Sequence, residues 1–525
     1  MGTTKENTLP ETAEMQTTDY VPEQPNYYYL ESRKQLIEDE VTSDLFRKLI
    51  ELQPHCSLAY TWDDIGMAAL VASLYGDKIR YCPQYAEWYI WDDSRWEKQI
   101  DAGIIMDKLQ TVLNLMVLYC DEMEEMDGKL NLKDYRKYIM SIRKNTSMKN
   151  ILEVLKTQVR ITATEFDANP YILNTPICAY DLRTMEIIQD REELNLTQVT
   201  NCNLKPGEAQ CERWYKFIDE IMCGNREQAA FLQRALGYSL LGVNREECMF
   251  IALGSQTRNG KGTLFSSILN VLGKEYAQGS DPSLICEAKN GKSTDFNSPQ
   301  PALRKLVNCR MVTMSESQRD VRLDAASMKA MTGRDTLTTR GLYEGSFDFI
   351  PQFTMWLNTN YLPAVTDDTV FKSDRIWVIK FDAFFDESKR DLDLKQLFSD
   401  PKNQPTILQW LIDGCQDYIL HGLNPPECVR ENTMEYRDKF DRVGNFLREC
   451  TTSDPTYKSK IVRGELYALY RAWCCKAENH YNPIGSTSFY TELSLRGYQI
   501  KKADGGWCVF GIKAEKPKSG VIQLT

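Results

Sequence analysis

Hydrophobic and polar positions along the chain follow two periods, and the changes between them mark the expected elements. Between residues 79 and 96 the pattern is that of a β-hairpin, with the apolar run 88–91 leading into a polar turn. Apolar residues then recur at steps of three and four over 101–120 and over 134–157, which predicts a helix in each stretch. The first part of the chain therefore indicates mixed helix and strand structure.

From residue 212 the pattern becomes that of an α/β domain. The predicted elements are helices at 214–222, 227–241 and 264–272 and short apolar strands at 249–253, 311–314 and 354–357. Each strand is followed at once by polar residues. Because ligands of open parallel sheets bind at the carboxyl ends of the strands, we expect these polar residues to line a binding site.

The patterns divide the chain into five regions and predict an α/β fold class. The regions are a flexible tail and helix at 1–59, an N-terminal α+β domain at 60–211, an α/β core at 212–385, a helical extension at 386–454 and a small domain at 455–525. The small domain has the element order of a winged helix. Its expected elements are helices at 463–477 and 486–496 and strands at 498–502 and 507–512.

Charge and composition narrow the classes of protein. The chain has 63 Lys and Arg against 74 Asp and Glu, a net charge of −11, so any nucleic-acid contact must come from a local basic surface. Its 16 cysteines form no Cys-x-x-Cys pair and it has 3 histidines, which argues against a zinc site. A polar N-terminus and the lack of a run of about 18 apolar residues predict a cytoplasmic protein that does not enter a membrane.

The glycine-bearing loop before the helix 264–272 has the composition of a phosphate-binding loop. Backbone N–H groups at a helix start favour phosphate oxygens, and Lys261 adds a positive charge. The usual pattern has glycine first and Ser or Thr after Gly-Lys, whereas Ser255 and Gly262 stand at those positions. We expect Thr263, one place later, to supply the hydroxyl for Mg²⁺. The residues expected to hold a nucleotide are Gly254, Ser255, Gln256, Thr257, Arg258, Asn259, Gly260, Lys261, Gly262 and Thr263.

The strands downstream add candidate chemistry to this loop. Ser315 and Glu316 follow one strand, where a carboxylate can orient Mg²⁺ and polarise a water molecule. Asn358 and Asn360 follow another, and their amides can bond a terminal phosphate. Each residue taken singly is typical of a solvated strand end or turn. Three such strand ends in order, after a Gly-Lys loop, favour a nucleotide site.

A series of ordered matches extends over residues 60–510 and resembles the phage, plasmid and poxvirus-type primase-helicases. The matching stretches are Trp88-Tyr-Ile-Trp with Arg95-Trp96, Phe166 to Asn174, Leu232 to Gly242, Asn259 to Thr263, Ser315-Glu316, Met331 to Asp335, Thr339 to Tyr343, Trp356 to Pro363 and Asp374 to Phe381. The C-terminal part of that family is a superfamily III AAA+ helicase. The resemblance therefore implies a P-loop NTPase core of the AAA+ kind, with ATP and Mg²⁺ as cofactors.

The resemblance also implies roles for single residues. Lys261 and Thr263 would be Walker A residues, Glu316 the Walker B acid and Asn360 the sensor, with Thr263 and Glu316 holding Mg²⁺. Arg375 would be an arginine finger that stabilises phosphoryl charge across a subunit boundary. The family often has two adjacent arginines there, whereas this chain has Asp374 before Arg375. A simple alternative is an arginine at a strand edge, paired with that aspartate.

Several basic and aromatic residues are candidate DNA contacts. By resemblance, the segment 329–343 leads into the family's channel hairpin. In the small C-terminal domain, two lysines lie beside the expected wing, where a protein-docking role is the alternative. A basic group in the predicted helix 134–157 is more typical of a solvated helix face. The DNA-binding candidates are Lys329, Arg334, Arg340, Tyr343, Lys501 and Lys502.

Together these features predict an ATP-dependent replicative DNA helicase of a phage, plasmid or virus. It would form a ring, with six subunits expected, and translocate on single-stranded or forked DNA in the cytoplasm of a bacterial host or an infected cell. Residues 60–211 leave little room for a primase domain, so we expect a separate primase partner. Two alternatives remain, a small-molecule nucleotide kinase and an origin-binding initiator that uses the nucleotide as a switch.

Overall fold

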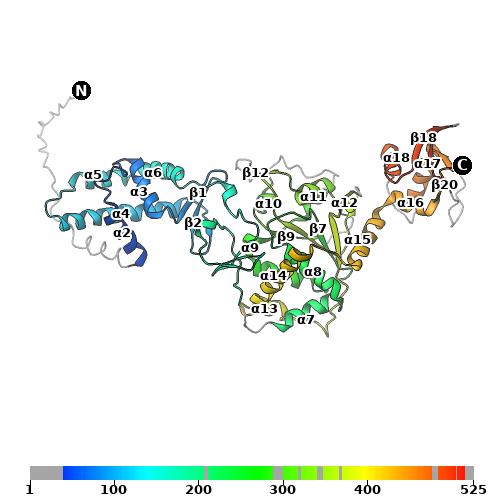
Figure 1. The fold of residues 1–525 in the computed structure, drawn as a ribbon, viewed down its shortest axis with the longest axis horizontal. Coiled ribbons are helices and arrows are strands. Elements are labelled where there is room, and N and C mark those ends of the chain that lie inside the picture. The colour runs from blue at the N-terminus through cyan, green and yellow to red at the C-terminus, as the bar shows by residue number, and fades with distance from the viewer. Residues whose placement is uncertain are drawn as a thin grey trace, which may run out of the picture. The chain divides into compact units, whose positions relative to one another are not determined.

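The computed structural model describes residues 39–205, 211–287, 300–316, 321–339, 347–365, 369–475, 483–503 and 505–514. These residues form two compact units (Figure 1). The first reaches Ile90 and resumes over Lys98–Thr162, and the second joins Trp91–Glu97 to the chain from Ala163 onward. The hairpin at residues 79–98 therefore contributes its tip to the second unit.

The described residues of the first unit form five helices and a small antiparallel sheet. Its helices are α2 (Glu40–Leu52), α3 (Asp64–Tyr75), α4 (Gly103–Met126), α5 (Lys133–Ile142) and α6 (Asn145–Gln158), and its sheet has the order β1 (Ile79–Cys82), β2 (Glu87–Trp91), β3 (Trp96–Lys98). Strands β2 and β3 lie where the alternating pattern predicts a hairpin. Helix α4 is the one described helix long and apolar enough to cross a membrane by those criteria alone, and much of it is buried in this unit's core.

Residues 134–157 form two helices, and the prediction of a single helix was wrong. Helix α5 ends at Ile142 and α6 begins at Asn145. In one straight helix at 100° per residue, Ile142 and Ile151 would point to opposite sides, since nine steps make two and a half turns. The break turns both apolar stripes toward the same core, where Ile139 and Leu155 are also fully buried.

The second unit is built on a five-stranded parallel sheet. Its strand order is β15 (Ile376–Lys380), β7 (Met249–Leu253), β13 (Thr354–Thr359), β9 (Met311–Glu316), β8 (Ala277–Ser280). The chain passes from β7 to the far edge strand β8 and later returns to β15 on the other side of β7. The carboxyl end of β7 is therefore a switch point in the strand order, where open parallel sheets bind ligands.

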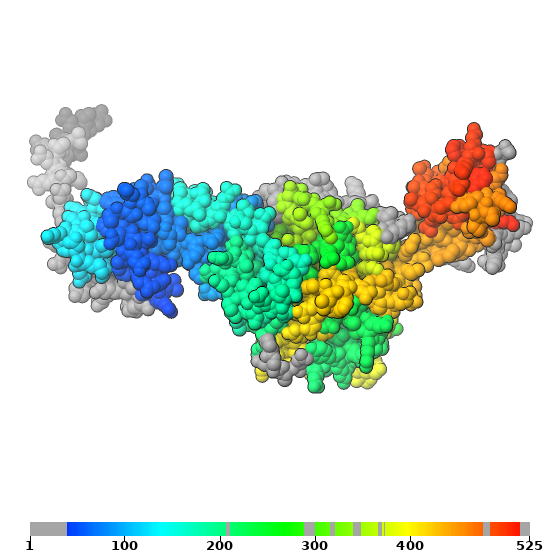
Figure 2. Space-filling view, viewed as in Figure 1, coloured from blue at the N-terminus to red at the C-terminus, as the bar shows by residue number. Residues whose placement is uncertain are grey.

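Successive residues of each strand face opposite layers of helices. Phe250 and Trp356 pack into the core shared with α7 (Glu212–Ile221), α8 (Arg226–Tyr238), α9 (Lys261–Tyr276) and α14 (Gln404–His421). Met249 and Leu357 face the core shared with α10 (Pro301–Arg304), α11 (Ala325–Thr332) and α15 (Glu427–Phe440). Figure 2 shows the yellow and orange surface of α14 and α15 lying against the green surface of the preceding helices. The expected α/β core with a parallel sheet is confirmed.

Strands β9 and β13 extend two residues further than their apolar runs. The predicted strands ended at Met314 and Leu357, but parallel pairing continues through Ser315 with Asn358 and through Glu316 with Thr359. Backbone hydrogen bonds between strands do not depend on side-chain polarity, so a polar strand end is not visible in a hydrophobic pattern. The remaining elements are β10 (Arg322–Leu323), β11 (Leu337–Thr339), β12 (Phe347–Phe349), β14 (Ala364–Val365), α12 (Thr369–Lys372) and α13 (Leu394–Ser399).

A small sheet, β4 (Ile172–Asn174), β5 (Ala179–Asp181), β6 (Ile187–Ile188), belongs to the second unit although the sequence pattern grouped it with residues 60–211. Buried Arg310 explains the attachment. Its guanidinium donates to the carbonyl oxygen of Leu240 and to that of Ile172, each at 2.8 Å. A buried guanidinium needs all its donors satisfied, so this residue holds the small sheet to the core.

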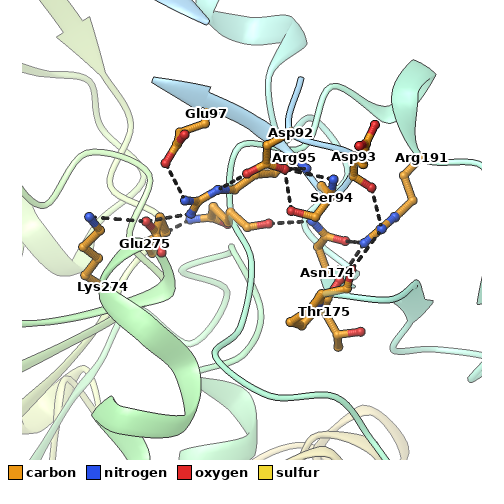
Figure 3. A network of polar contacts seen from close by, with 12 residues as sticks. Asp92, Asp93, Ser94, Arg95, Glu97, Asn174, Thr175, Arg191, Lys274 and Glu275 are labelled. Carbon is orange, nitrogen blue, oxygen red and sulfur yellow. Dashed lines mark hydrogen bonds and ion pairs between the residues drawn. The ribbon is translucent and has the colours of Figure 1, made fainter. Parts of the chain in front are cut away.

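A polar network ties the tip of the hairpin to the end of α9 (Figure 3). Arg191 donates to Asn174 Oδ1 at 2.8 Å, and Asn174 Nδ2 donates to the carbonyl oxygen of Ser94 at 2.9 Å. Arg95 pairs with Glu275, the penultimate residue of α9, at 2.7 Å. Residues that carry the sequence resemblance before the core thus have a structural role, anchoring this segment beside the parallel sheet.

The C-terminal region is a separate three-helix arrangement with short strands. Its elements are α16 (Arg442–Cys450), β16 (Thr451–Ser453), β17 (Lys460–Val462), α17 (Arg463–Cys474), α18 (Ser486–Leu495), β18 (Gln499–Ala503), β19 (Gly506–Phe510) and β20 (Ile512–Ala514). Strands β17, β19 and β18 form an antiparallel sheet in that order. Phe446, Tyr470 and Phe489 form its fully buried aromatic centre.

Candidate functional site

The loop between β7 and α9 folds tightly because two of its glycines allow no side chain. A Cβ atom on Gly254 would lie 1.9 Å from Asn259 Nδ2 and 2.4 Å from Lys261 Nζ. Gly260 has φ +84°, and its Cβ would lie 2.3 Å from Ile221 Cγ2. Both positions therefore require glycine, for steric reasons at the first and for steric and conformational reasons at the second.

Lys261 is buried at the first turn of α9. Its ammonium group donates to the carbonyl oxygen of Thr359 at 2.9 Å and to Asn360 Oδ1 at 3.0 Å. Among the side chains that the structure describes, which do not include that of Glu316, no carboxylate lies within ion-pair distance of it. Burial lowers the pKa of Lys261 to about 8. A buried cation with neutral partners is costly, so an arriving anion would be strongly favoured here.

The rest of the loop presents an open surface next to this lysine. Buried Asn259 holds the loop by donating from Nδ2 to the carbonyl oxygen of Gln256 at 2.6 Å. Ser255, Gln256, Thr257 and Arg258 are exposed. The first N–H groups of a helix have no partner within the helix, and the helix dipole favours negative charge at that end. Loop, helix start and lysine together form a cradle suited to phosphate groups.

Glu316 lies at the same edge of the sheet by backbone register. The pairing of β13 places Thr359 between Leu253 on one side and Glu316 on the other. Neighbouring strands are about 4.8 Å apart, so the Glu316 backbone lies one strand away from the residue that binds Lys261. Its side chain is outside the described residues. The structure thus brings Lys261, Asn360 and the backbone of Glu316 to one place.

Arg375 lies at the amino edge of the sheet, where the parallel strands begin, and Lys261 lies at the carboxyl edge, where they end. It immediately precedes β15, whereas Lys261 follows β7, and the five residues of β7 span about 16 Å. Its guanidinium donates to Glu247 Oε2 at 2.8 Å and to Thr332 Oγ1 at 2.9 Å. Glu247, and not the adjacent Asp374, is therefore the carboxylate that it pairs with. The structure does not bring Arg375 to the phosphate cradle of its own chain.

The DNA-binding candidates of the second unit lie near this amino edge or outside the described residues. Lys329 is half-buried in α11. Arg334 is exposed, donates to the carbonyl oxygen of Arg245 at 2.9 Å and lies 3.8 Å from Glu247 Oε1. Arg334 therefore shares Glu247 with Arg375. Arg340 and Tyr343 fall outside the described residues.

The C-terminal candidates lie on an exposed hairpin. Lys501 and Lys502 are both exposed on β18, and Lys502 is directly opposite Trp507 of β19. The Trp507 side chain is 53% exposed. Sequence reasoning treated Trp507 as a strand residue and missed it as a surface group, although its place directly after a Gly-Gly turn was a signal.

A pocket of about 310 Å³ opens beside the start of α9. Arg213 and Phe217 of α7, Thr263 of α9 and Phe385 after β15 are on its wall. The wall also carries Arg258, Lys389, Arg390 and Lys395, with Asp391 as its one carboxylate. Such an excess of cations favours an anionic ligand. Sequence reasoning missed this pocket because its walls come from segments about 170 residues apart, although Phe384-Phe385 and Lys389-Arg390 stand close together after the last strand.

Among the described residues, no group of three or more His, Cys, Asp or Glu side chains is placed to hold a metal ion.

One segment of this chain matches a known protein family, and longer parts of it are similar to viral proteins. Residues 68–223 match the family described as D5 N terminal like. A protein of Acanthamoeba polyphaga mimivirus named "Putative helicase" is 27% identical over 264 residues, 47% of this chain and 27% of its own length. A "Putative helicase" of Frog virus 3 (isolate Goorha) is 23% identical over 337 residues, 60% of this chain and 33% of its own. The chain spans about a third of the length of these curated relatives.

Solved structures show a distant likeness. The apo structure of the NrS-1 C-terminal region has a TM-score of 0.43 and 11% identity, covering 82% of this chain and 95% of that one. Another apo form of the same region gives a TM-score of 0.42. The D5 N-terminal-like segment and the similarity to viral proteins named as helicases support the resemblance of this chain to the phage and viral primase-helicases.

Proposed function

We propose that this chain is the ATP-hydrolysing subunit of a replicative DNA helicase, with a superfamily III AAA+ core. The observation that carries the proposal is Lys261, which is buried at the switch point of a parallel sheet and bonded to Asn360, with no carboxylate among the described side chains within ion-pair distance. A structural lysine would gain from a counter-ion, whereas this one is placed for a ligand that brings negative charge.

The residues around the cradle suit the terminal phosphates of ATP. Lys261 would bind the β- and γ-phosphates, and Asn360 would hold the lysine and bond the γ-phosphate or the attacking water. Glu316, one strand further, would take the proton of that water and help to orient the cation. Mg²⁺, when bound, would neutralise phosphate charge during transfer.

Arg375 would act on the ATP of a neighbouring subunit. Its place at the amino edge, about a strand length from the cradle of its own chain, supports action in trans. Only a closed ring of copies gives every site such a partner, so we propose a cyclic homo-oligomer, with six subunits expected. Arg334 and Lys329 lie at the same edge. With Arg340 and Tyr343 they remain our candidates for the DNA channel.

The C-terminal domain would be a winged helix that contacts DNA. Residues 451–514 hold nine Lys and Arg against five Asp and Glu, in a chain whose net charge is −11. Lys501 and Lys502 would bind phosphates, and exposed Trp507 would stack on a base or on a duplex end. A local basic surface with an exposed aromatic ring fits nucleic acid better than an acidic protein partner.

Mutation of this hairpin separates the two contributions. Trp507→Ala should weaken binding to a forked oligonucleotide about tenfold with an unchanged salt dependence, because stacking involves no counter-ions. Replacing Lys501 and Lys502 by Ala should reduce the salt dependence itself. Fluorescence anisotropy at several salt concentrations measures both, and Trp507→Phe, which keeps an aromatic face, is the control. Equal DNA binding by all variants would remove the hairpin from the proposal.

The test of the whole proposal is phosphate release from ATP with and without single-stranded DNA, followed by unwinding of a forked duplex. A helicase should show hydrolysis that DNA stimulates, and it should unwind the duplex. In the cell, we expect it to act in the host cytoplasm with a separate primase as its partner. Hydrolysis that ignores DNA but requires a small phosphate acceptor would indicate a nucleotide kinase. Binding of ATP and DNA without unwinding would favour an origin-binding initiator.

A further inference from the structure

Lys261 and Thr263 project from different sides of α9, which the loop pattern does not reveal. Lys261 begins α9 and faces Thr359 and Asn360 at the sheet edge. Thr263 is two residues further, and at 100° per residue its side chain leaves the helix about 200° away. It lies on the wall of the pocket formed with α7 and the segment after β15. The Thr263 hydroxyl and the Lys261 ammonium group therefore serve different sides of the helix.

Gly262 stands between them, at the position where a phosphate-binding loop usually has Ser or Thr. A Cβ atom on Gly262 would meet no other atom within 4 Å. Steric exclusion thus does not explain this glycine, in contrast to Gly254 and Gly260, whose Cβ atoms would clash. The place of the usual magnesium-binding hydroxyl is open space on this helix.

The lining of the pocket on the Thr263 side suits the sugar end of a nucleotide. Phe385 supplies aromatic surface with buried Phe217 behind it, and Arg213 and Arg258 supply guanidinium donors. Arg213 donates to Glu220 Oε2 at 3.1 Å, and its Nε lies 3.7 Å from the carboxylate of Asp391 on the pocket wall. A ribose and base with an adjoining α-phosphate need this mixture of apolar faces, donors and positive charge.

We infer that Thr263 binds the sugar or α-phosphate side of the nucleotide in this pocket, and that α9 provides no side-chain oxygen for Mg²⁺. The inference rests on the proposed nucleotide binding and revises the role expected for Thr263. It leaves the cation to the phosphates, to water and to the carboxylate of Glu316. Nucleotide affinity should then depend on Thr263 whether or not Mg²⁺ is present.

The experiment is a titration of the full chain with a fluorescent ATP analogue, once in excess Mg²⁺ and once in excess EDTA. Thr263→Val should lower the affinity by the same factor in both conditions, about fivefold to tenfold for one lost hydrogen bond. Thr263→Ser, which keeps the hydroxyl, should retain most of the affinity. Gly262→Ser, which fits without a clash, should increase the ratio of the affinity in Mg²⁺ to that in EDTA.

Two results would overturn the inference. Thr263→Val could lose the Mg²⁺ effect while its affinity in EDTA stays at the wild-type value, which would make Thr263 the metal ligand after all. It could also bind as the wild type does in both conditions, which would exclude any nucleotide contact. Thermal unfolding of each variant checks that it is folded, and Thr263→Ala, which also removes the hydroxyl, carries the test if the valine variant is not. A wild-type chain that binds no nucleotide would instead refute the proposed function itself.

Discussion

The cations at the two ends of strand β7 have different kinds of partner. At the carboxyl end, Lys261 is buried, and its partners among the described side chains and backbone are neutral oxygen atoms. At the amino end, Arg375 and Arg334 are both within reach of one carboxylate, that of Glu247. A buried cation without a counter-ion needs an incoming anion, whereas a partly exposed cation with a carboxylate is already satisfied. The carboxyl end of β7 is therefore arranged to bind an anionic ligand, whereas Arg375 at the amino end must leave Glu247 before it can contact a phosphate.

Lys261→Ala should have the largest effect and abolish ATP hydrolysis, because it removes the buried cation at the start of α9, where we propose that the terminal phosphates bind. Steady-state phosphate release measures this loss. Lys274→Ala is the matched control, since Lys274 is an exposed lysine at the far end of the same helix. A Lys261→Ala protein with wild-type turnover would end the comparison.

Arg375→Ala should reduce turnover about a thousandfold, the scale of an arginine finger, with ATP affinity nearly unchanged. Mixing it with the Lys261→Ala protein should restore part of the activity, because an intact finger then meets an intact cradle. Arg322→Ala, a change at another exposed arginine of the second unit, should behave as the wild type. Properly assembled mixed rings without any recovery would contradict a role in trans.

The lowered pKa of Lys261 predicts that ATP binding takes up a proton. In the free protein this pKa is about 8. A bound triphosphate favours the charged lysine and raises the pKa, so affinity should be highest below pH 8 and should fall as the pH rises above it. At pH 8, calorimetry in buffers of different ionisation enthalpy should show uptake of about half a proton. Affinity that is level from pH 7 to pH 9 would mean that the lysine stays charged without a ligand.

Glu247→Gln should have the smallest effect, a rise in turnover of about twofold to fivefold. The substitution weakens the hold on Arg375, and a partly exposed ion pair is worth up to about 1 kcal/mol. Turnover at a fixed degree of assembly, measured with light scattering, tests this. A fall in turnover would show that Glu247 positions the guanidinium for its task and does not retain it.

Local sequence signals were sufficient where chemistry and chain order coincide. The apolar run 249–253 predicts β7 with its observed bounds, and the helix predicted at 264–272 lies within α9, which begins three residues earlier, at Lys261. The polar ends of β9 and β13 could not be predicted in the same way, since strand pairing carries Glu316 and Thr359 into the sheet regardless of hydrophobicity. The same holds for the break between α5 and α6, which the packing of their apolar faces requires.

By itself, the sequence determined three of the five strands of the parallel sheet, the loop that follows β7 and the identity of the residues at the ends of those strands. Short-range periodicity and residue chemistry are sufficient for that, because they act within one element. Only the tertiary structure decided that Arg375 lies at the edge away from Lys261 and that Thr263 faces a pocket built from distant segments. Those facts depend on strand order and on the direction in which each side chain leaves its helix, and both are set by packing between elements far apart in the chain.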